Sequence, residues 1–176
     1  MSTALKNHLS RASFEAKVEK ASLRETLRRV PTPITFVAAV VDGRPVGMVV
    51  GSFVGISIEP ALVGFYTQHC SGTWPALKKH LDRGGEIGVS VLGINFHGDV
   101  YSLAGPQEKR FDRNWNLAGD EAIILDGADS FIVGRADLIA EAGDHDYVQL
   151  SVERSFVGLN DSQALVFHDS RIGLVT

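Results

Sequence analysis

The sequence is poor in cysteine, in aromatic residues and in positive charge. Among 176 residues the only cysteine is Cys70, so no internal disulfide can form and we expect an intracellular, cytoplasmic protein. Lysine and arginine number 17 against 21 for aspartate and glutamate, and this net charge of −4 argues against a nucleic-acid partner. No run of about 18 apolar residues occurs, so no membrane-spanning segment is expected.

Several motifs that carry chemistry are also absent. Neither G-x-x-x-x-G-K-[ST] nor G-x-G-x-x-G occurs, which excludes a P-loop and a Rossmann fingerprint. The segment Gly51–Gly55 is not a nucleophile elbow, because its serine is not central. The six histidines lack metal-ligand spacing, so no metal site is expected. His69 and Cys70 are adjacent and would point to opposite faces of a strand, which favours a small loop or core thiol over a nucleophile.

Glycine and apolar residues dominate what is present. Eighteen glycines indicate many turns, and 44% hydrophobic residues suffice for one core. Residues 1–12 show no pattern and are expected to fray, whereas residues 13–176 are expected to form a single domain. Apolar spacing predicts a helix over residues 13–30, with a fresh start at the capping box Ser22–Glu25 and an end at the prolines that follow.

Short apolar segments predict a mainly β fold. Asp42-Gly43, between two of them, favours a hairpin turn because both residues tolerate positive φ. A helix capped by Thr73 is expected to end just before Gly84, another is expected over residues 95–105, and residues 107–126 have no regular pattern. Strands are expected over residues 34–41, 46–50, 56–58, 61–67, 86–92, 128–139, 147–153 and 164–167. This arrangement is typical of an antiparallel barrel or sandwich.

Four segments carry candidate chemistry, and each has a plain structural alternative. Residues 47–53 end a strand at Gly51, where a flat ligand can approach the backbone or the chain can simply bend. Residues 67–75 form a hydroxyl-rich loop that leads into a helix, which suits a phosphate or an ordinary helix cap. His145 in a turn is a ligand-facing or a solvated imidazole, and Arg110 in a charged run pairs with an anion or with water.

In this order the segments resemble the flavin reductase family with the FMN-binding split-barrel fold, from about Leu23 to about Phe167. Five segments carry the resemblance: Leu27-Arg28-Arg29-Val30-Pro31-Thr32, Arg44-Pro45-Val46-Gly47-Met48-Val49-Val50-Gly51-Ser52-Phe53, Ser57-Ile58-Glu59-Pro60-Ala61-Leu62-Val63, Ser71-Gly72-Thr73-Trp74-Pro75-Ala76-Leu77 and Gly143-Asp144-His145. No single motif is specific, but five in the correct order and spacing are fairly specific together.

The resemblance implies an antiparallel split β-barrel with a few flanking helices. It implies an NAD(P)H-dependent flavin reductase, an oxidoreductase that transfers hydride from NADH or NADPH to bound FMN or FAD. It also implies a homodimer that supplies reduced flavin to a partner monooxygenase. There are three alternatives. The first is a flavin-binding split-barrel protein without significant reductase activity, serving as electron carrier or sensor. The others are a flavin-free barrel scaffold and a self-contained oxidase or monooxygenase of the wider split-barrel group.

The resemblance also assigns site residues. The flavin-binding positions would be Met48, Val49, Val50, Gly51, Ser52, Thr67, Gln68, Ser71, Gly72, Thr73, Tyr101 and Ser102. Of these, Tyr101 and Ser102 stand where the family often has an arginine–phenylalanine pair. His145 would face the nicotinamide, and Leu150, in place of a usual glycine, would narrow its approach. No side chain is assigned as a general acid or base, since the cofactor carries the chemistry.

Overall fold

The computed structural model describes residues 19–158 and 163–175. The chain divides into two units, one ending at Val30 and the other beginning at Pro31. The helical segments are α2 (Lys20–Leu27), α3 (Trp74–Leu81), η1 (Ile94–Phe96), α4 (Val100–Leu103) and η2 (Gln107–Lys109). The strands are β1 (Thr32–Pro33), β2 (Thr35–Val41), β3 (Arg44–Val50), β4 (Val54–Ser57), β5 (Leu62–Gln68), β6 (Glu86–Val91), β7 (Trp115–Leu117), β8 (Ile123–Leu125), β9 (Ser130–Ala142), β10 (His145–Val157), β11 (Leu165–His168) and β12 (Arg171–Leu174).

The first unit contains α2, whose expected capping box is wrong. Because α2 begins at Lys20, Ser22 lies inside its first turn, and Glu19 takes the N-cap position without a side-chain hydrogen bond. The carbonyl oxygen of Ser22 accepts a hydrogen bond from Thr26 Oγ1 at 3.0 Å. Residues 1–12, expected to fray, and residues 13–18, expected to be helical, lie outside the described residues.

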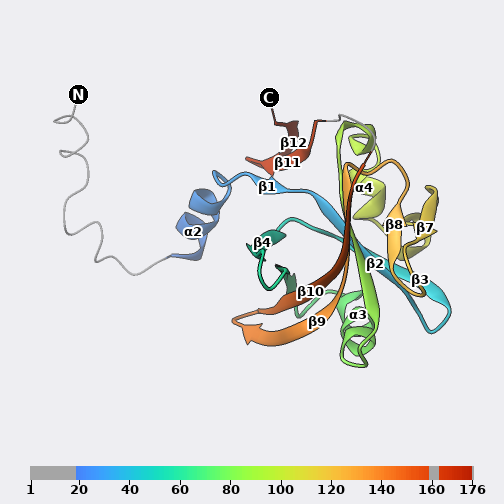
Figure 1. The fold of residues 1–176 in the computed structure, drawn as a ribbon. Helices are drawn as coiled ribbons and strands as arrows, with labels where there is room; N and C mark the ends of the chain where they lie inside the picture. Colours follow the sequence, from blue (N-terminus) through green and yellow to red (C-terminus); the bar gives the residue numbers. More distant parts are fainter. Residues whose placement is uncertain (1–18, 159–162, 176) are drawn as a thin grey trace, which may run out of the picture. The chain divides into compact units, whose positions relative to one another are not determined.

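The second unit is built on a seven-stranded sheet in the order β3-β2-β6-β9-β10-β5-β4 (Figure 1). All of its neighbouring strands are antiparallel, which confirms the expected mainly β, antiparallel class. The hairpin between β2 and β3 is also confirmed. Asp42 and Gly43 have φ values of 50° and 76°, as a tight two-residue turn requires.

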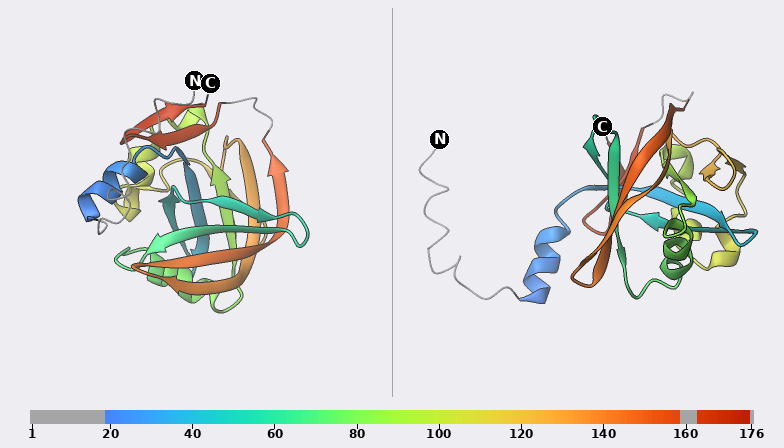
Figure 2. Two further views of the ribbon diagram at one scale, coloured as in Figure 1. Left: turned by 90° about the vertical axis from the view of Figure 1, so that its left-hand side faces the viewer. Right: turned by 60° about the horizontal axis from the view of Figure 1, so that its bottom comes forward.

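Two long strands fold this sheet over on itself. β9 and β10 contain 13 residues each, and their pairing shifts register between Gln149 and Leu150 and between Val152 and Arg154. Such bulges bend and twist a strand locally. Figure 2 shows β5 and β10 running across the direction of β2 and β6. β3 and β4 are the two edge strands of this sheet. Among the described residues they do not pair with each other, so the curled sheet does not close into a complete barrel.

Apolar side chains form two clusters on opposite faces of the sheet. Strand β2 serves both, because its successive residues point to opposite sides: Val37 and Ala39 join one cluster, and Phe36 and Ala38 join the other. The first cluster includes residues of α3, and the second includes residues of α4, β8 and β11. Leu150 is fully buried in the first cluster.

Two stretches differ from the sequence-based expectation. Residues 95–105 do not form one helix: η1 and α4 are separate turns with His97, Gly98 and Asp99 between them. Residues 107–126, expected to be irregular, contain η2 and the two-stranded sheet of β7 and β8. A third sheet has the strand order β1-β11-β12. Of these strands, only β11 was expected from the sequence.

Candidate functional site

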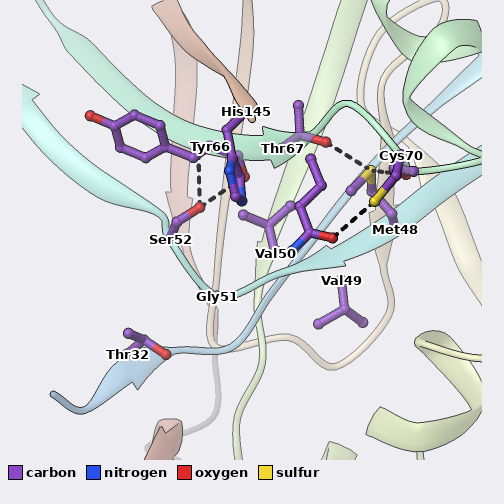
Figure 3. Close-up of a pocket in the computed structure, with 12 residues that line it drawn as sticks. Thr32, Met48, Val49, Val50, Gly51, Ser52, Tyr66, Thr67, Cys70 and His145 are labelled. Atoms are coloured by element: carbon purple, nitrogen blue, oxygen red, sulfur yellow. Dashed lines mark hydrogen bonds between the residues drawn. The ribbon is translucent and has the colours of Figure 1, made fainter. Parts of the chain in front are cut away.

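A cavity of about 500 Å³ opens where β3 and β5 end beside the turn between β9 and β10 (Figure 3). This volume lies within the usual range of about 300–1,000 Å³ for small-molecule sites. The lining residues are Thr32, Met48, Val49, Val50, Gly51, Ser52, Tyr66, Thr67, Gln68, Cys70, Ser71 and His145. The β5–β10 register brings the far ends of this set together, because His145 pairs with Gln68.

The end of β3 supplies the backbone wall of the cavity. A Cβ atom on Gly51 would make only ordinary contacts, 3.4 Å to Thr32 Oγ1 and 3.8 Å to the carbonyl oxygen of Pro33, so packing within the chain does not require a glycine at this position. Within the described part of the chain, the backbone N–H groups of Gly51 and Ser52 donate to no acceptor. Unpaired amide donors beside a cavity are suited to the polar edge of a heteroaromatic ring.

Ser52 holds this wall against β5 through its hydroxyl group. Its Oγ donates to the carbonyl oxygen of Tyr66 at 2.9 Å and accepts from the N–H of Tyr66 at 2.8 Å, as Figure 3 shows. The hydroxyl hydrogen is therefore already used, and the donor that Ser52 offers to a ligand is its backbone N–H group. Tyr66 adds an aromatic wall, and its ring lies 5.2 Å from that of Tyr147.

The loop between β5 and α3 carries the hydroxyl groups at the other end of the cavity. Thr73 occupies the N-cap position of α3 but makes no side-chain cap hydrogen bond. Ser71 Oγ caps the helix instead, because it accepts from the N–H groups of Thr73 at 3.4 Å and Trp74 at 3.3 Å. The expected cap at Thr73 is corrected to Ser71.

Arg110 lies against this loop and is not a solvated residue of a charged run. Its Nη1 donates to Thr73 Oγ1 and to the carbonyl oxygen of Gly47, both at 2.7 Å, and its Nε donates to the carbonyl oxygen of Gly105 at 2.7 Å. Among the described residues no carboxylate forms an ion pair with it. Partial burial lowers the pKa of Arg110, which remains a cation. Glu108 acts on Arg110 only at longer range and raises its pKa against the larger effect of burial. A positive charge fixed beside a hydroxyl-rich loop is suited to an anion.

Two aspartates flank His145 at the rim of the cavity. His145 Nδ1 lies 2.6 Å from a carboxylate oxygen of Asp144, and this hydrogen bond is the main reason that the pKa of Asp144 is below its ordinary value. Asp146 accepts from Trp74 Nε1 at 2.7 Å and contacts His69 Nε2 at 3.1 Å. The bond from Trp74 is the main cause of the lowered pKa of Asp146. Because Nδ1 of His145 is the atom that contacts Asp144, its Nε2 atom is left to face a ligand.

Most of the expected flavin-binding residues line this one cavity, and four do not. Gly72 and Thr73 belong to the adjoining loop. Tyr101 is 72% exposed, and Ser102 lines a second cavity that also contains Arg110. The reason is that α4 is a single turn that buries Val100 and Leu103, which directs the two residues between them outward. Leu150 cannot narrow the nicotinamide approach from its place in the core.

The sequence pattern missed Thr32, Tyr66 and Cys70 in the lining and the contact between Arg110 and the loop. An arginine–phenylalanine pair does exist as Arg110-Phe111, later in the chain than expected, and it was a usable signal. Cys70 is exposed, and its Sγ donates to Gln68 Oε1 at 3.4 Å.

The described residues also lack two other kinds of feature. They contain no group of three or more histidine, cysteine, aspartate or glutamate residues that could hold a metal ion. In the same residues, no helix is long and apolar enough to cross a bilayer.

Comparison with known proteins gives one consistent family. The model of the flavin reductase like domain matches residues 27–175. A flavin reductase of Pseudomonas putida is 33% identical over 152 residues, which cover 85% of this chain and 86% of that protein. The reductase subunit HsaB of a flavin-dependent monooxygenase of Mycobacterium tuberculosis is 29% identical over 142 residues, covering 80% of this chain and 73% of that protein. A flavin reductase domain protein from Arthrobacter, 22% identical, shares the fold with a TM-score of 0.80, over 90% of this chain and 96% of its own.

Proposed function

The chain belongs to the flavin reductase like domain family, and from that premise we propose that it is an NAD(P)H-dependent flavin reductase that supplies reduced flavin to a partner monooxygenase. The observation that carries the proposal is the single cavity that combines the β3 end, the β5–α3 loop and His145. The residues of this cavity would hold the flavin, which would supply the redox chemistry as the acceptor of a hydride from the nicotinamide. The single cysteine supports the expectation of a cytoplasmic location.

The ring of the flavin would lie against the backbone from Val50 to Ser52. The cavity lined by these residues has room for a flat ring, and among the described residues the N–H groups of Gly51 and Ser52 donate to no acceptor. Amide donors fixed before the reaction stabilise negative charge that develops on a bound ring, because they need no reorganisation. The chain's contribution is thus to bind and orient, with no proton transfer by a side chain.

The phosphate of the flavin would lie at the loop that precedes α3. Ser71 already accepts from the N–H groups of the N-cap residue Thr73 and of Trp74, and Pro75 has no N–H group, so the helix N-terminus offers few free donors. The fixed cation Arg110, held through Thr73, supplies the attraction instead. The residues therefore fit a flavin that carries at least one phosphate, which both FMN and FAD do.

His145 would face the incoming nicotinamide. Replacing His145 with alanine is expected to raise KM for NADH about tenfold, the equivalent of about 1.4 kcal/mol, while the Kd for FMN stays within about twofold. Steady-state kinetics at saturating FMN and fluorescence titration of FMN measure the two quantities. His97→Ala, at an exposed histidine outside the cavity, is the control and should change neither. An unchanged KM for NADH would mean that His145 is a solvated turn residue that does not contact the nicotinamide.

An anaerobic mixture of the purified protein, FMN and NADH tests the activity. Loss of flavin absorbance with catalytic amounts of protein is expected. FMN binding without this loss would favour the flavin carrier or sensor, and no quenching of FMN fluorescence would favour the flavin-free scaffold. Repeating the assay with NADPH and with FAD decides which nucleotides are preferred.

A homodimer is part of the proposal, and an exposed apolar face supports it. On β4 and on the following turn, Val54, Ile56 and Ile58 are 49%, 42% and 94% exposed, and at the end of β10 Phe156 and Val157 are 50% and 87% exposed. Beside them, residues of β4, β5, β9 and β10 line an apolar groove. Exposed apolar surface of this kind marks an interaction site, and a second copy of the chain is the occupant that the family resemblance implies.

Ile58→Glu is expected to convert the dimer into a monomer of 19.0 kDa in sedimentation velocity, because a carboxylate would be desolvated in the interface. Leu117→Glu is the matched control, since Leu117 is also exposed but lies on β7, which Figure 1 shows far from β4. A wild-type chain that sediments as a monomer at micromolar concentration would contradict the dimer.

A further inference from the structure

Asp146 does not line the cavity, yet it connects two segments that do. Its side chain is 13% exposed and accepts from the indole of Trp74 and from the imidazole of His69 through different carboxylate oxygens. Trp74 is the first residue of α3 and is 3% exposed. His69 lies in the loop before α3, and its backbone N–H also donates to the carbonyl oxygen of Asp144 at 3.1 Å.

These bonds fix the loop of residues 69–73 relative to the turn that carries His145. One bond is made at each end of the loop, so the carboxylate spans the segment that contains Ser71 and Thr73. Ser71 caps α3 and lines the cavity, while Thr73 accepts from Arg110. A shift of the loop would therefore displace the cap and the Arg110 contact together.

The electrostatic effect of Asp146 on a phosphate has the opposite sign to its structural effect. A carboxylate near the loop repels a phosphate, so deleting its charge would by itself strengthen FMN binding. The side chains facing Asp146 are Trp74 and His69, with Lys78 close enough to contribute to its lowered pKa. This difference in sign separates a role in position from a role in charge.

We propose that Asp146 is a positioning residue that holds the phosphate-binding loop in register with the nicotinamide side of the site. The proposal rests on the proposed function, since it assigns the loop to a flavin phosphate. Its specific consequence is that Asp146 contributes to the binding of FMN and far less to the binding of riboflavin, which has the same ring without the phosphate.

The test compares Asp146→Ala with the wild-type protein by fluorescence titration of FMN and of riboflavin. We expect the Kd for FMN to rise about tenfold, from the loss of two charge-assisted hydrogen bonds, and the Kd for riboflavin to stay within about twofold. Asp146→Asn should retain most of the FMN affinity, because a carboxamide keeps an acceptor for the indole and its NH₂ group can donate to the imidazole. Glu141→Ala is the matched control, since Glu141 pairs with Asp146 across β9 and β10 but has an exposed carboxylate.

The outcomes are distinct. Tighter or unchanged FMN binding in Asp146→Ala, or an equal loss for FMN and riboflavin, overturns the proposal. If thermal unfolding shows that Asp146→Ala does not fold, Trp74→Phe takes its place, because it removes one of the two hydrogen bonds to Asp146. It should raise the Kd for FMN more than the Kd for riboflavin. A wild-type protein that binds neither flavin contradicts the proposed function itself, whereas an active wild-type protein with an unaffected variant contradicts only the positioning role.

Discussion

Replacing Arg110 with alanine should raise the Kd for FMN about a hundredfold, the equivalent of about 3 kcal/mol. The variant loses the fixed cation of the loop, and it leaves the carbonyl oxygens of Gly47 and Gly105 and the hydroxyl of Thr73 without their donor. The riboflavin Kd should stay within about threefold, because the ring would lie against β3. Equilibrium titration with both flavins gives the ratio directly.

Two further variants distinguish charge from geometry at this position. Arg110→Lys keeps the charge but cannot reach three acceptors with one ammonium group, so an intermediate loss of FMN affinity is expected. Lys109→Ala removes an adjacent, exposed cation and should leave the FMN Kd nearly unchanged. Equal losses at positions 109 and 110 would mean that only net charge matters, and the assignment of Arg110 to the phosphate would then be wrong.

Replacing Gly88 with alanine should destabilise the fold by about 3 kcal/mol or more. A Cβ atom there would lie 2.0 Å from the carbonyl oxygen of Ile123 and 2.7 Å from its carbonyl carbon. Both atoms belong to the backbone of β8, which cannot yield as a flexible side chain would. Chemical denaturation followed by circular dichroism measures the loss of free energy of unfolding.

Gly55→Ala is the matched control for this substitution. Gly55 also lies in a strand, but a Cβ atom there meets no other atom within 4 Å. Its effect should stay within about 0.5 kcal/mol. A loss as large as that of Gly88→Ala would show that glycine itself, and not the approach of β8, determines stability in this sheet.

The parts of the fold that were predictable have local causes. The β2–β3 hairpin depends on Asp42-Gly43, and α3 depends on the residues around Pro75, so a short window of sequence contains the whole signal. The sheet of β7 and β8 has strands of three residues, too short to show a period. Its position depends on β6, where Ser90 Oγ accepts from the N–H of Leu125 at 2.9 Å.

The candidate site follows the same rule. Segments around Gly51 and His145 were predictable because each has a recognisable motif, and the β5–β10 register then brings their ends together. Arg110 was left open, because a run of charged residues looks alike in solvent and against a loop. Only the tertiary fold brings Arg110 to Gly47 and Thr73, which lie far from it in sequence.

The thiol of Cys70, in the lining of the cavity, provides a site for chemical labelling. Because Cys70 is the chain's one cysteine and is exposed, a maleimide dye would label a single, known position without any prior mutagenesis. A fluorescent probe at that position would lie at the cavity, near Gln68 and Ser71, and would report the binding and release of a flavin in real time.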